Sequence, residues 1–190
     1  MAAFDIETAL SRVEAAFATF DAPVLAFVAL HESGLHASGL PAYGPFRVLV
    51  SCILSLRTLD QVTAPVSRAL FAVADTPEKI RELPAETLDA LIRPVAFHTR
   101  KTAQIQAIAD ILLRDHEGQV PKTMEALLAL PGVGRKTANL TLVAGHGLPG
   151  ICVDTHVHRI ANRWGYVRTK TPDETEKRLR GKLPEPPVSG

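Results

Sequence analysis

Residues 130–139 read LPGVGRKTAN, and this stretch constrains the fold of the chain more than any other. Two glycines, Gly132 and Gly134, lie between segments with helical spacing, "TMEALLALP" and "GRKTANLTLVAGHG". Glycine adopts positive φ without strain and lets another group approach closely. The pattern therefore predicts two helices joined by a tight hairpin over about residues 123–146, with Thr123 as an N-cap and Gly145 and Gly147 closing the second helix.

The rest of the chain reads as helix after helix, interrupted by proline and glycine. "FRVLVSCILSL" (46–56) is apolar nearly all round and predicts a buried central helix. Val153, Val157, Ile160, Ala161 and Trp164 form one apolar stripe at helical spacing, which favours a helix over a strand after "LPG". Other helices are expected at about 6–20, 61–73, 77–82, 85–92, 98–115 and 171–184. We therefore expect an all-α protein.

Glycines beside a lysine often mark a phosphate site, and two known motifs can be excluded. The P-loop requires GxxxxGK[ST], but Arg135 precedes Lys136 here. The dinucleotide fingerprint requires GxGxxG after a strand, but its last position is Thr137 and the preceding segment is helical. A hairpin followed by a helix instead offers N–H groups and a positive dipole end to a phosphate, and so binds a backbone without reading sequence. A glycine turn with a structural role alone is the alternative.

Charge is distributed unevenly along the chain. The net charge is +1, yet residues 1–130 hold 11 Lys and Arg against 15 Asp and Glu, while residues 131–190 hold 10 against 5. A basic C-terminal third suggests a surface for a polyanion, although chance bias of a solvated surface explains it equally well. The longest apolar run is far short of a membrane span, and the N-terminal segment lacks the features of a signal peptide, so we expect a cytoplasmic protein. Cys52 and Cys152 give neither a disulfide framework nor a CxxC metal pair.

"LPGVGRKTANLTL" followed by "VDTHVHRIANRWG" resembles the endonuclease III family of helix-hairpin-helix (HhH-GPD) DNA glycosylases. The likeness covers about residues 43–184 and includes "YGPFRVLVSCILSLRTLD" and "FHTRKTAQI" in the family's order. It implies a six-helix core at 43–148 and a second helical domain formed by 1–42 together with 149–190, truncated relative to the family. It also implies a bifunctional glycosylase and AP lyase of base excision repair. Such an enzyme removes oxidised pyrimidines from double-stranded DNA, and we expect it to be monomeric and nucleoid-associated.

Lys136 and Asp154 carry the chemistry that the resemblance implies. Lys136 lies in the first turn of a helix beside Arg135, where the helix dipole, the neighbouring cation and a partly dry cleft favour the neutral amine. This amine can attack the sugar as the damaged base leaves, and β-elimination from the Schiff base breaks the strand. Asp154, near the N-terminus of its own helix, is expected to stay ionised and to stabilise the cationic sugar or assist proton transfer. Without the resemblance, the simplest interpretation is a phosphate contact for Lys136 and a helix N-cap for Asp154.

Further residues are expected at the DNA surface. By the resemblance, Arg57 and Phe97 fill the gap left by the extruded base, and Phe97 is an apolar wedge of the expected type. Relatives often have glutamine at the first position, so Arg57 is a departure that bears on how the orphaned partner base is read. A core phenylalanine is the alternative for Phe97. The expected phosphate contacts are the hairpin residues Gly132, Val133, Gly134 and Arg135, together with His98, Arg100, Lys101, His156, His158 and Arg159.

The sequence departs from the family at its C-terminal end. Relatives usually carry four cysteines there that ligate an iron–sulfur cluster, whereas this sequence ends at "LPEPPVSG". Either this is a cluster-free member or the cysteine segment lies outside the given sequence, and we expect no cluster and no other cofactor in this chain.

Two other classes of function remain open. A non-catalytic DNA-binding module would keep only the hairpin's contact with phosphate. A metal hydrolase could be built on "CVDTHVH", with Cys152, Asp154, His156 and His158 as ligands, but the helical stripe there fans these residues apart. The preferred lesion does not follow from the sequence.

Overall fold

The computed structural model describes residues 5–17, 44–148 and 150–183. Within these ranges the chain is helical and has no strand, so the predicted all-α class is confirmed. It divides into two compact units, residues 27–150 and residues 1–26 with 151–190. The division expected from the sequence lay at residues 43 and 148, and residues 18–43 lie outside the described ranges. No described helix is long and apolar enough to cross a membrane.

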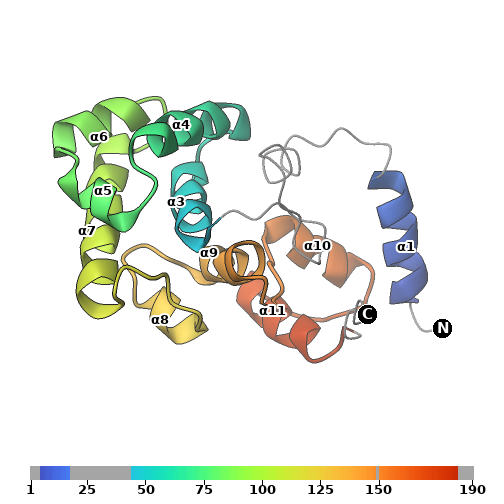
Figure 1. Ribbon diagram of the computed structural model, residues 1–190. Coiled ribbons are helices and arrows are strands. Elements are labelled where there is room, and N and C mark those ends of the chain that lie inside the picture. Colours follow the sequence, from blue (N-terminus) through green and yellow to red (C-terminus); the bar gives the residue numbers. More distant parts are fainter. Residues whose placement is uncertain (1–4, 18–43, 149, 184–190) are drawn as a thin grey trace. The chain divides into compact units, whose positions relative to one another are not determined.

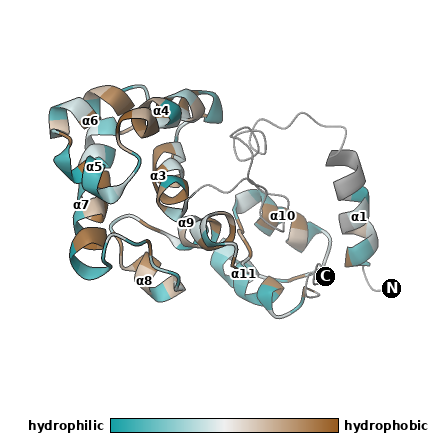
Figure 2. Ribbon diagram, viewed as in Figure 1, coloured by the Kyte–Doolittle hydropathy of each residue, from teal (hydrophilic) through white to brown (hydrophobic). Residues whose placement is uncertain are grey.

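The larger unit is a helical bundle built around α3. Its elements are α3 (Pro45–Ser55), α4 (Asp60–Val73), α5 (Pro77–Glu82), α6 (Ala85–Ile92), α7 (His98–Asp115), α8 (Met124–Leu128), α9 (Arg135–Leu140) and the π-helical turn η1 (Thr141–Gly145) (Figure 1). α5 and α6 pack against α7, while α4, α7, α9 and η1 pack against α3. α3 is brown along most of its length in Figure 2, and Leu49, Ile53 and Leu54 are fully buried in it. The predicted buried central helix is therefore confirmed.

The helix expected after the hairpin contains a π-helical turn that its sequence does not predict. α9 continues into η1, and the chain then turns at Gly147, whose φ is +66°. η1 ends at Gly145 and Gly147 follows at the turn, so the predicted end of this helix is confirmed. A Cβ built on Gly145 would lie 2.8 Å from the Cα of Pro45, so glycine is needed here for the close packing of η1 on α3.

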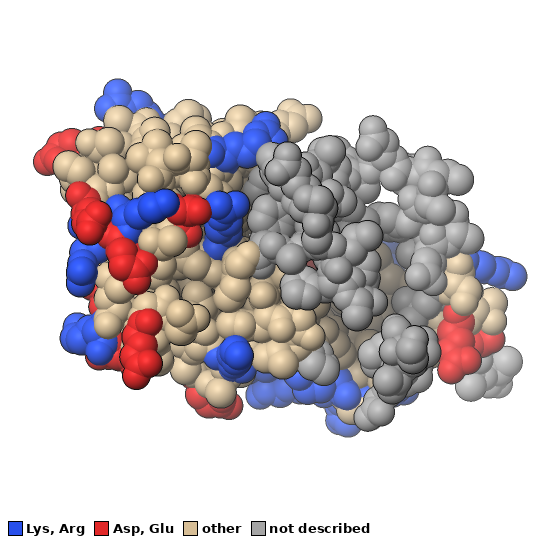
Figure 3. Space-filling view, viewed as in Figure 1, with Lys and Arg blue, Asp and Glu red and all other residues tan. Residues whose placement is uncertain are grey.

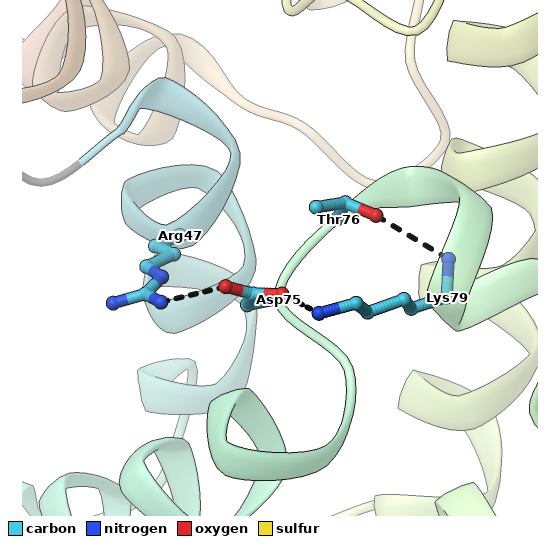
Figure 4. A network of polar contacts seen from close by, with 4 residues as sticks. All are labelled: Arg47, Asp75, Thr76 and Lys79. Atoms are coloured by element: carbon cyan, nitrogen blue, oxygen red, sulfur yellow. Dashed lines mark hydrogen bonds and ion pairs between the residues drawn. The ribbon is translucent and has the colours of Figure 1, made fainter.

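A polar network joins α3 to the start of α5 (Figure 4). Asp75 accepts hydrogen bonds from Arg47 Nη2 at 2.7 Å and from Lys79 Nζ at 2.8 Å. These two bonds lower the pKa of Asp75 to about 2. Thr76 caps α5 by accepting from the Lys79 N–H. Since Asp75 lies between the two helices, the network fixes where α5 begins.

The smaller unit contains α1 (Ile6–Phe17), α10 (Thr155–Arg163) and α11 (Pro172–Arg180). α10 packs against α11 around a small core of Val153, Ala161, Tyr166, Val167 and Leu179. In contrast to α3, α11 is largely teal in Figure 2. The helix expected from the stripe at 153–164 is confirmed.

Candidate nucleic-acid interface

The hairpin between α8 and α9 is held from within by α7. Gly132 has a φ of +69°, a conformation that favours glycine. Gln104 on α7 donates from Nε2 to the carbonyl oxygen of Pro131 at 2.9 Å. A Cβ on Gly132 would lie only 2.4 Å from that nitrogen. Val133 is buried, so the hairpin is anchored on both sides of its tip.

At Gly134, in contrast, neither the backbone conformation nor the packing explains why the residue is glycine. Its φ of −95° suits any residue, and a Cβ built on it would have no atom within 4 Å. Nothing inside the described part of the chain therefore requires glycine at this position. The space beside it is open, immediately before the N-terminus of α9.

Lys136 lies in the first turn of the helix that this hairpin starts. Its side chain is exposed, and Arg135 beside it is half-buried. Gly134 occupies the N-cap position and provides no side chain to cap the helix. The positive end of the helix dipole and two cationic side chains thus lie at one exposed turn. The partly dry cleft expected around Lys136 from the sequence stays a prediction.

Arg57 and Phe97, 40 positions apart in the sequence, lie together in the larger unit. The guanidinium carbon of Arg57 is 5.9 Å from the centroid of the Phe97 ring, within cation–π range. Phe97 is 59% exposed, so the alternative of a core phenylalanine is wrong. Both residues have left-handed backbones, with φ of +55° and +57°. A bulky residue in this region costs on the order of 1–3 kcal/mol, and such strain is concentrated at functional sites.

Lys101 does not contact phosphate, contrary to expectation. It is only 4% exposed, and burial lowers the pKa of its ammonium group below the ordinary value. Its Nζ donates to the carbonyl oxygens of Leu54 and Leu56, both at 2.8 Å, and to Thr58 Oγ1 at 3.2 Å. The ammonium group thus binds the C-terminal end of α3 and the loop that follows it.

The two other predicted contacts on α7 have different surroundings. His98 Nδ1 lies 2.8 Å from Asp89 Oδ1 on α6, and this hydrogen bond holds the pKa of Asp89 below its ordinary value. His98 therefore ties α6 to α7, and its role at phosphate is not supported. Arg100 is exposed, and its expected contact with DNA stays a prediction.

In the smaller unit, Asp154 is the N-cap of α10. One of its carboxylate oxygens accepts from the backbone N–H groups of His156 and Val157, both at 2.9 Å. The structural role foreseen for Asp154 is thus present, and it fixes the side chain in an extended turn before the helix. His156 and Arg159 are exposed on α10.

His158 faces the inside of the smaller unit. Its Nδ1 lies 2.6 Å from Thr175 Oγ1 on α11, so it joins the two helices. Among the residues that the structure describes, no group of three or more His, Cys, Asp or Glu side chains could hold a metal ion. The metal-site reading of "CVDTHVH" therefore has no support here. The expectation that this chain holds no iron–sulfur cluster stays a prediction.

Basic side chains gather at the C-terminal end of α11. Its last turn carries Lys177, Arg178 and Arg180, and blue side chains gather along the lower edge of the view, where α11 lies (Figure 3). Over α5 and α6, by contrast, red and blue side chains are mixed. The first half of α11 carries Asp173, Glu174 and Glu176, so the helix as a whole has no excess of basic residues.

The sequence did not indicate the structural roles of Thr58 and Gln104. Thr58 Oγ1 accepts from Lys101 and also from the Ala96 N–H at 3.1 Å. Both residues act across long sequence separations, through a hydroxyl and an amide that are common on any surface. Only the fold could reveal them.

Comparison with known proteins gives a consistent result. Residues 50–185 match the family model described as HhH-GPD superfamily base excision DNA repair protein. Endonuclease III of Thermotoga maritima is 47% identical over 149 residues, an alignment that covers 77% of this chain and 70% of that protein. Endonuclease III-like protein 1 of Mus musculus is 44% identical over 167 residues, covering 86% of this chain but only 55% of the mouse protein.

Solved structures agree with these relatives. The fold is similar to that of a trapped endonuclease III–DNA covalent intermediate described as an estranged-adenine complex. The TM-score is 0.76 at 30% sequence identity, and the match covers 94% of this chain and 77% of that one. A non-covalent endonuclease III–DNA complex matches with the same values.

Proposed function

Because the chain belongs to the endonuclease III family of the HhH-GPD superfamily, we propose that it is a bifunctional DNA glycosylase and AP lyase of base excision repair. Its substrate would be double-stranded DNA carrying an oxidised pyrimidine or an abasic site. The observation that carries this proposal is the hairpin, with open space at Gly134 and an exposed lysine in the first turn of the following helix. Action as a monomer at the nucleoid stays a prediction.

Phosphate binding would come first. The hairpin presents backbone N–H groups and the positive end of α9 to a DNA backbone, and open space at Gly134 allows a phosphate to come close. Arg135, Arg100, His156 and Arg159 would add charge along the strand. Since these groups recognise phosphate and not bases, binding is expected to be independent of sequence and strongly weakened by salt.

Lys136 would then act as the nucleophile. Its amine nitrogen forms a bond to the anomeric carbon of the sugar, the bond from that carbon to the base breaks, and the base leaves with the bonding electrons and a proton. The bond from the anomeric carbon to the ring oxygen then breaks as the nitrogen lone pair forms the C=N bond of the Schiff base, and the ring oxygen takes up a proton. Loss of the adjacent sugar proton then expels the 3′ phosphate by β-elimination, and water releases the lysine. Because Lys136 is exposed in the protein, bound DNA must supply the dry surroundings that favour the neutral amine.

Asp154 would support departure of the base. A carboxylate near a cationic sugar stabilises the charge that develops as the glycosidic bond breaks, or assists proton transfer. The N-cap contacts with His156 and Val157 fix one carboxylate oxygen, which orients the group without protonating it. Asparagine can make the same cap, so replacing Asp154 by asparagine removes the charge and keeps the local structure.

The test is borohydride trapping of a covalent protein–DNA adduct. Lys136→Gln should abolish trapping while leaving DNA affinity largely intact, because the hairpin N–H groups remain. Arg135→Gln is the matched control, since it removes a neighbouring cation and keeps the amine. Asp154→Asn should slow base removal at least about a hundredfold, whereas a pre-formed abasic site should still be trapped through Lys136.

Three outcomes would decide between the functions. Trapping that survives in Lys136→Gln at the wild-type rate would place the nucleophile elsewhere. Tight binding to damaged duplex without trapping or excision by the wild-type chain would instead favour a non-catalytic DNA-binding module. Excision without trapping would point to a glycosylase that lacks the lyase step.

A further inference from the structure

The loops that carry Arg57 and Phe97 are joined by a single hydroxyl. Thr58 Oγ1 accepts from the Ala96 N–H at 3.1 Å, so the residue after Arg57 is bonded to the residue before Phe97. The same oxygen accepts from Lys101 Nζ at 3.2 Å. The link therefore crosses from one loop to the other at the point where both backbones are left-handed.

Lys101 also takes part in the link between the two loops. Its ammonium group has three protons, and it donates to three oxygens at the end of α3 and in the loop that follows, two of them backbone carbonyls. A buried ammonium is costly unless it is fully hydrogen-bonded, and burial lowers the pKa of this one. Its backbone N–H in turn donates to the carbonyl oxygen of Phe97 at 3.0 Å. One residue of α7 thus contacts both loops.

We propose that Lys101 and Thr58 are positioning residues that hold Arg57 and Phe97 as one preformed wedge for base extrusion. The inference rests on the proposed glycosylase function and goes beyond it, because neither residue touches DNA. An exposed phenylalanine in a strained backbone would otherwise relax away from the arginine that stacks on it. A preformed wedge orders no side chains when DNA binds and so favours the extruded base.

Thr58→Val is the most direct perturbation, since it keeps the shape of the side chain and removes the shared hydroxyl. Thr58→Ser keeps the hydroxyl and serves as the rescue. Thr102→Val is the control on α7, because it removes a hydroxyl that donates to the His98 carbonyl oxygen and to Asp89 Oδ1 without touching the link. Lys101→Met removes the ammonium group and should act like Thr58→Val.

These variants should slow excision of a paired lesion more than cleavage of a pre-formed abasic site. We expect Thr58→Val to slow excision of thymine glycol from a paired duplex roughly tenfold, the loss of about one well-formed hydrogen bond. Cleavage of the abasic site, where no base has to be extruded, should change less than about twofold. In a Phe97→Ala background Thr58→Val should have no further effect, since the wedge is already lost. Equal slowing on both substrates, or an undiminished effect in that background, would overturn the proposal.

Amide hydrogen exchange at Ala96 tests the link independently of catalysis. Exchange should be faster in Thr58→Val and unchanged in Thr58→Ser and Thr102→Val, because only the first removes the acceptor of the Ala96 N–H. Unchanged exchange in Thr58→Val would overturn the proposal whether or not the protein excises bases. If the wild-type chain neither excises nor is trapped, the proposed function fails, and the exchange data still decide whether the link holds the two loops together.

Discussion

Replacing the two hairpin glycines by alanine should give opposite results. Gly132→Ala places a Cβ on a residue with φ of +69°, which costs about 1–2 kcal/mol for a non-glycine residue. The Cβ would also lie 2.4 Å from Gln104 Nε2. That amide is the end of a flexible side chain and can move away, at the loss of its hydrogen bond to Pro131, about 1 kcal/mol. Gly132→Ala should therefore lower the free energy of unfolding by about 2–3 kcal/mol.

Gly134→Ala should leave stability nearly unchanged and weaken DNA binding. The backbone at Gly134 suits alanine, and a Cβ there meets no atom within 4 Å. A small loss at the N-cap and a small gain from a less flexible unfolded chain roughly cancel, within about 0.5 kcal/mol. If a phosphate approaches this position, the methyl group displaces it from a charge-assisted hydrogen bond worth about 1.5–3 kcal/mol. Affinity should then fall roughly tenfold or more.

The pair is measured by urea unfolding followed by circular dichroism, and by fluorescence anisotropy with a duplex that contains a stable abasic-site analogue. Gln104→Ala provides a check, since in this background Gly132→Ala should cost only the backbone strain. Gly132→Ala with wild-type stability would refute the account of the turn. Gly134→Ala with wild-type affinity would show that no phosphate approaches the hairpin there.

Three further predictions concern other parts of the chain. Phe97→Ala should slow excision of a paired lesion far more than abasic-site cleavage and leave the melting temperature unchanged, whereas equal losses with a lower melting temperature would mark a packing role. Asp75→Asn should lower the free energy of unfolding at neutral pH by on the order of 1 kcal/mol after solvent screening. Since the pKa of Asp75 is lowered to about 2, this difference should persist above the ordinary aspartate pKa and vanish as the pH falls through about 2, which acid titration of both proteins would check. Arg159→Ala should weaken binding to all DNA sequences alike and reduce the salt dependence by about one phosphate contact, and a changed lesion preference at unchanged affinity would contradict this role.

Much of the fold could be predicted because the helical periodicity of the apolar residues agrees with the positions of the prolines and glycines that interrupt the helices. The helix expected at 98–115 matches α7, and the apolar segment at 46–56 matches α3 to within one residue. The π-helical turn could not be foreseen, because its residues are as helix-compatible as those around them. What makes Gly145 necessary is Pro45, one hundred positions earlier, and not anything in its own segment.

The site was predictable where the motif is local and not where it depends on tertiary contacts. The hairpin and the cap at Asp154 follow from neighbouring residues, whereas the link through Thr58 needs a partner 38 positions away. The prediction of a phosphate contact for Lys101 rested on its charge and not on its position in the helix. Lys101 begins the stripe that continues at Ile105, Ile108 and Leu112, all buried, so periodicity alone would have placed it on the inner face of α7.

The π-helical turn η1 also bears on how the length of this chain can vary. In such a turn hydrogen bonds run from residue i to i+5, and the His146 N–H accordingly reaches the Thr141 carbonyl oxygen. The turn thus holds one residue more than an α-turn. A single deletion within 141–145 would leave an ordinary α-turn, with the hairpin and Gly147 still in place. The same deletion in α7 would rotate every later side chain by about 100°, and would turn buried isoleucines toward water. Natural insertions and deletions in this helix are therefore expected at η1.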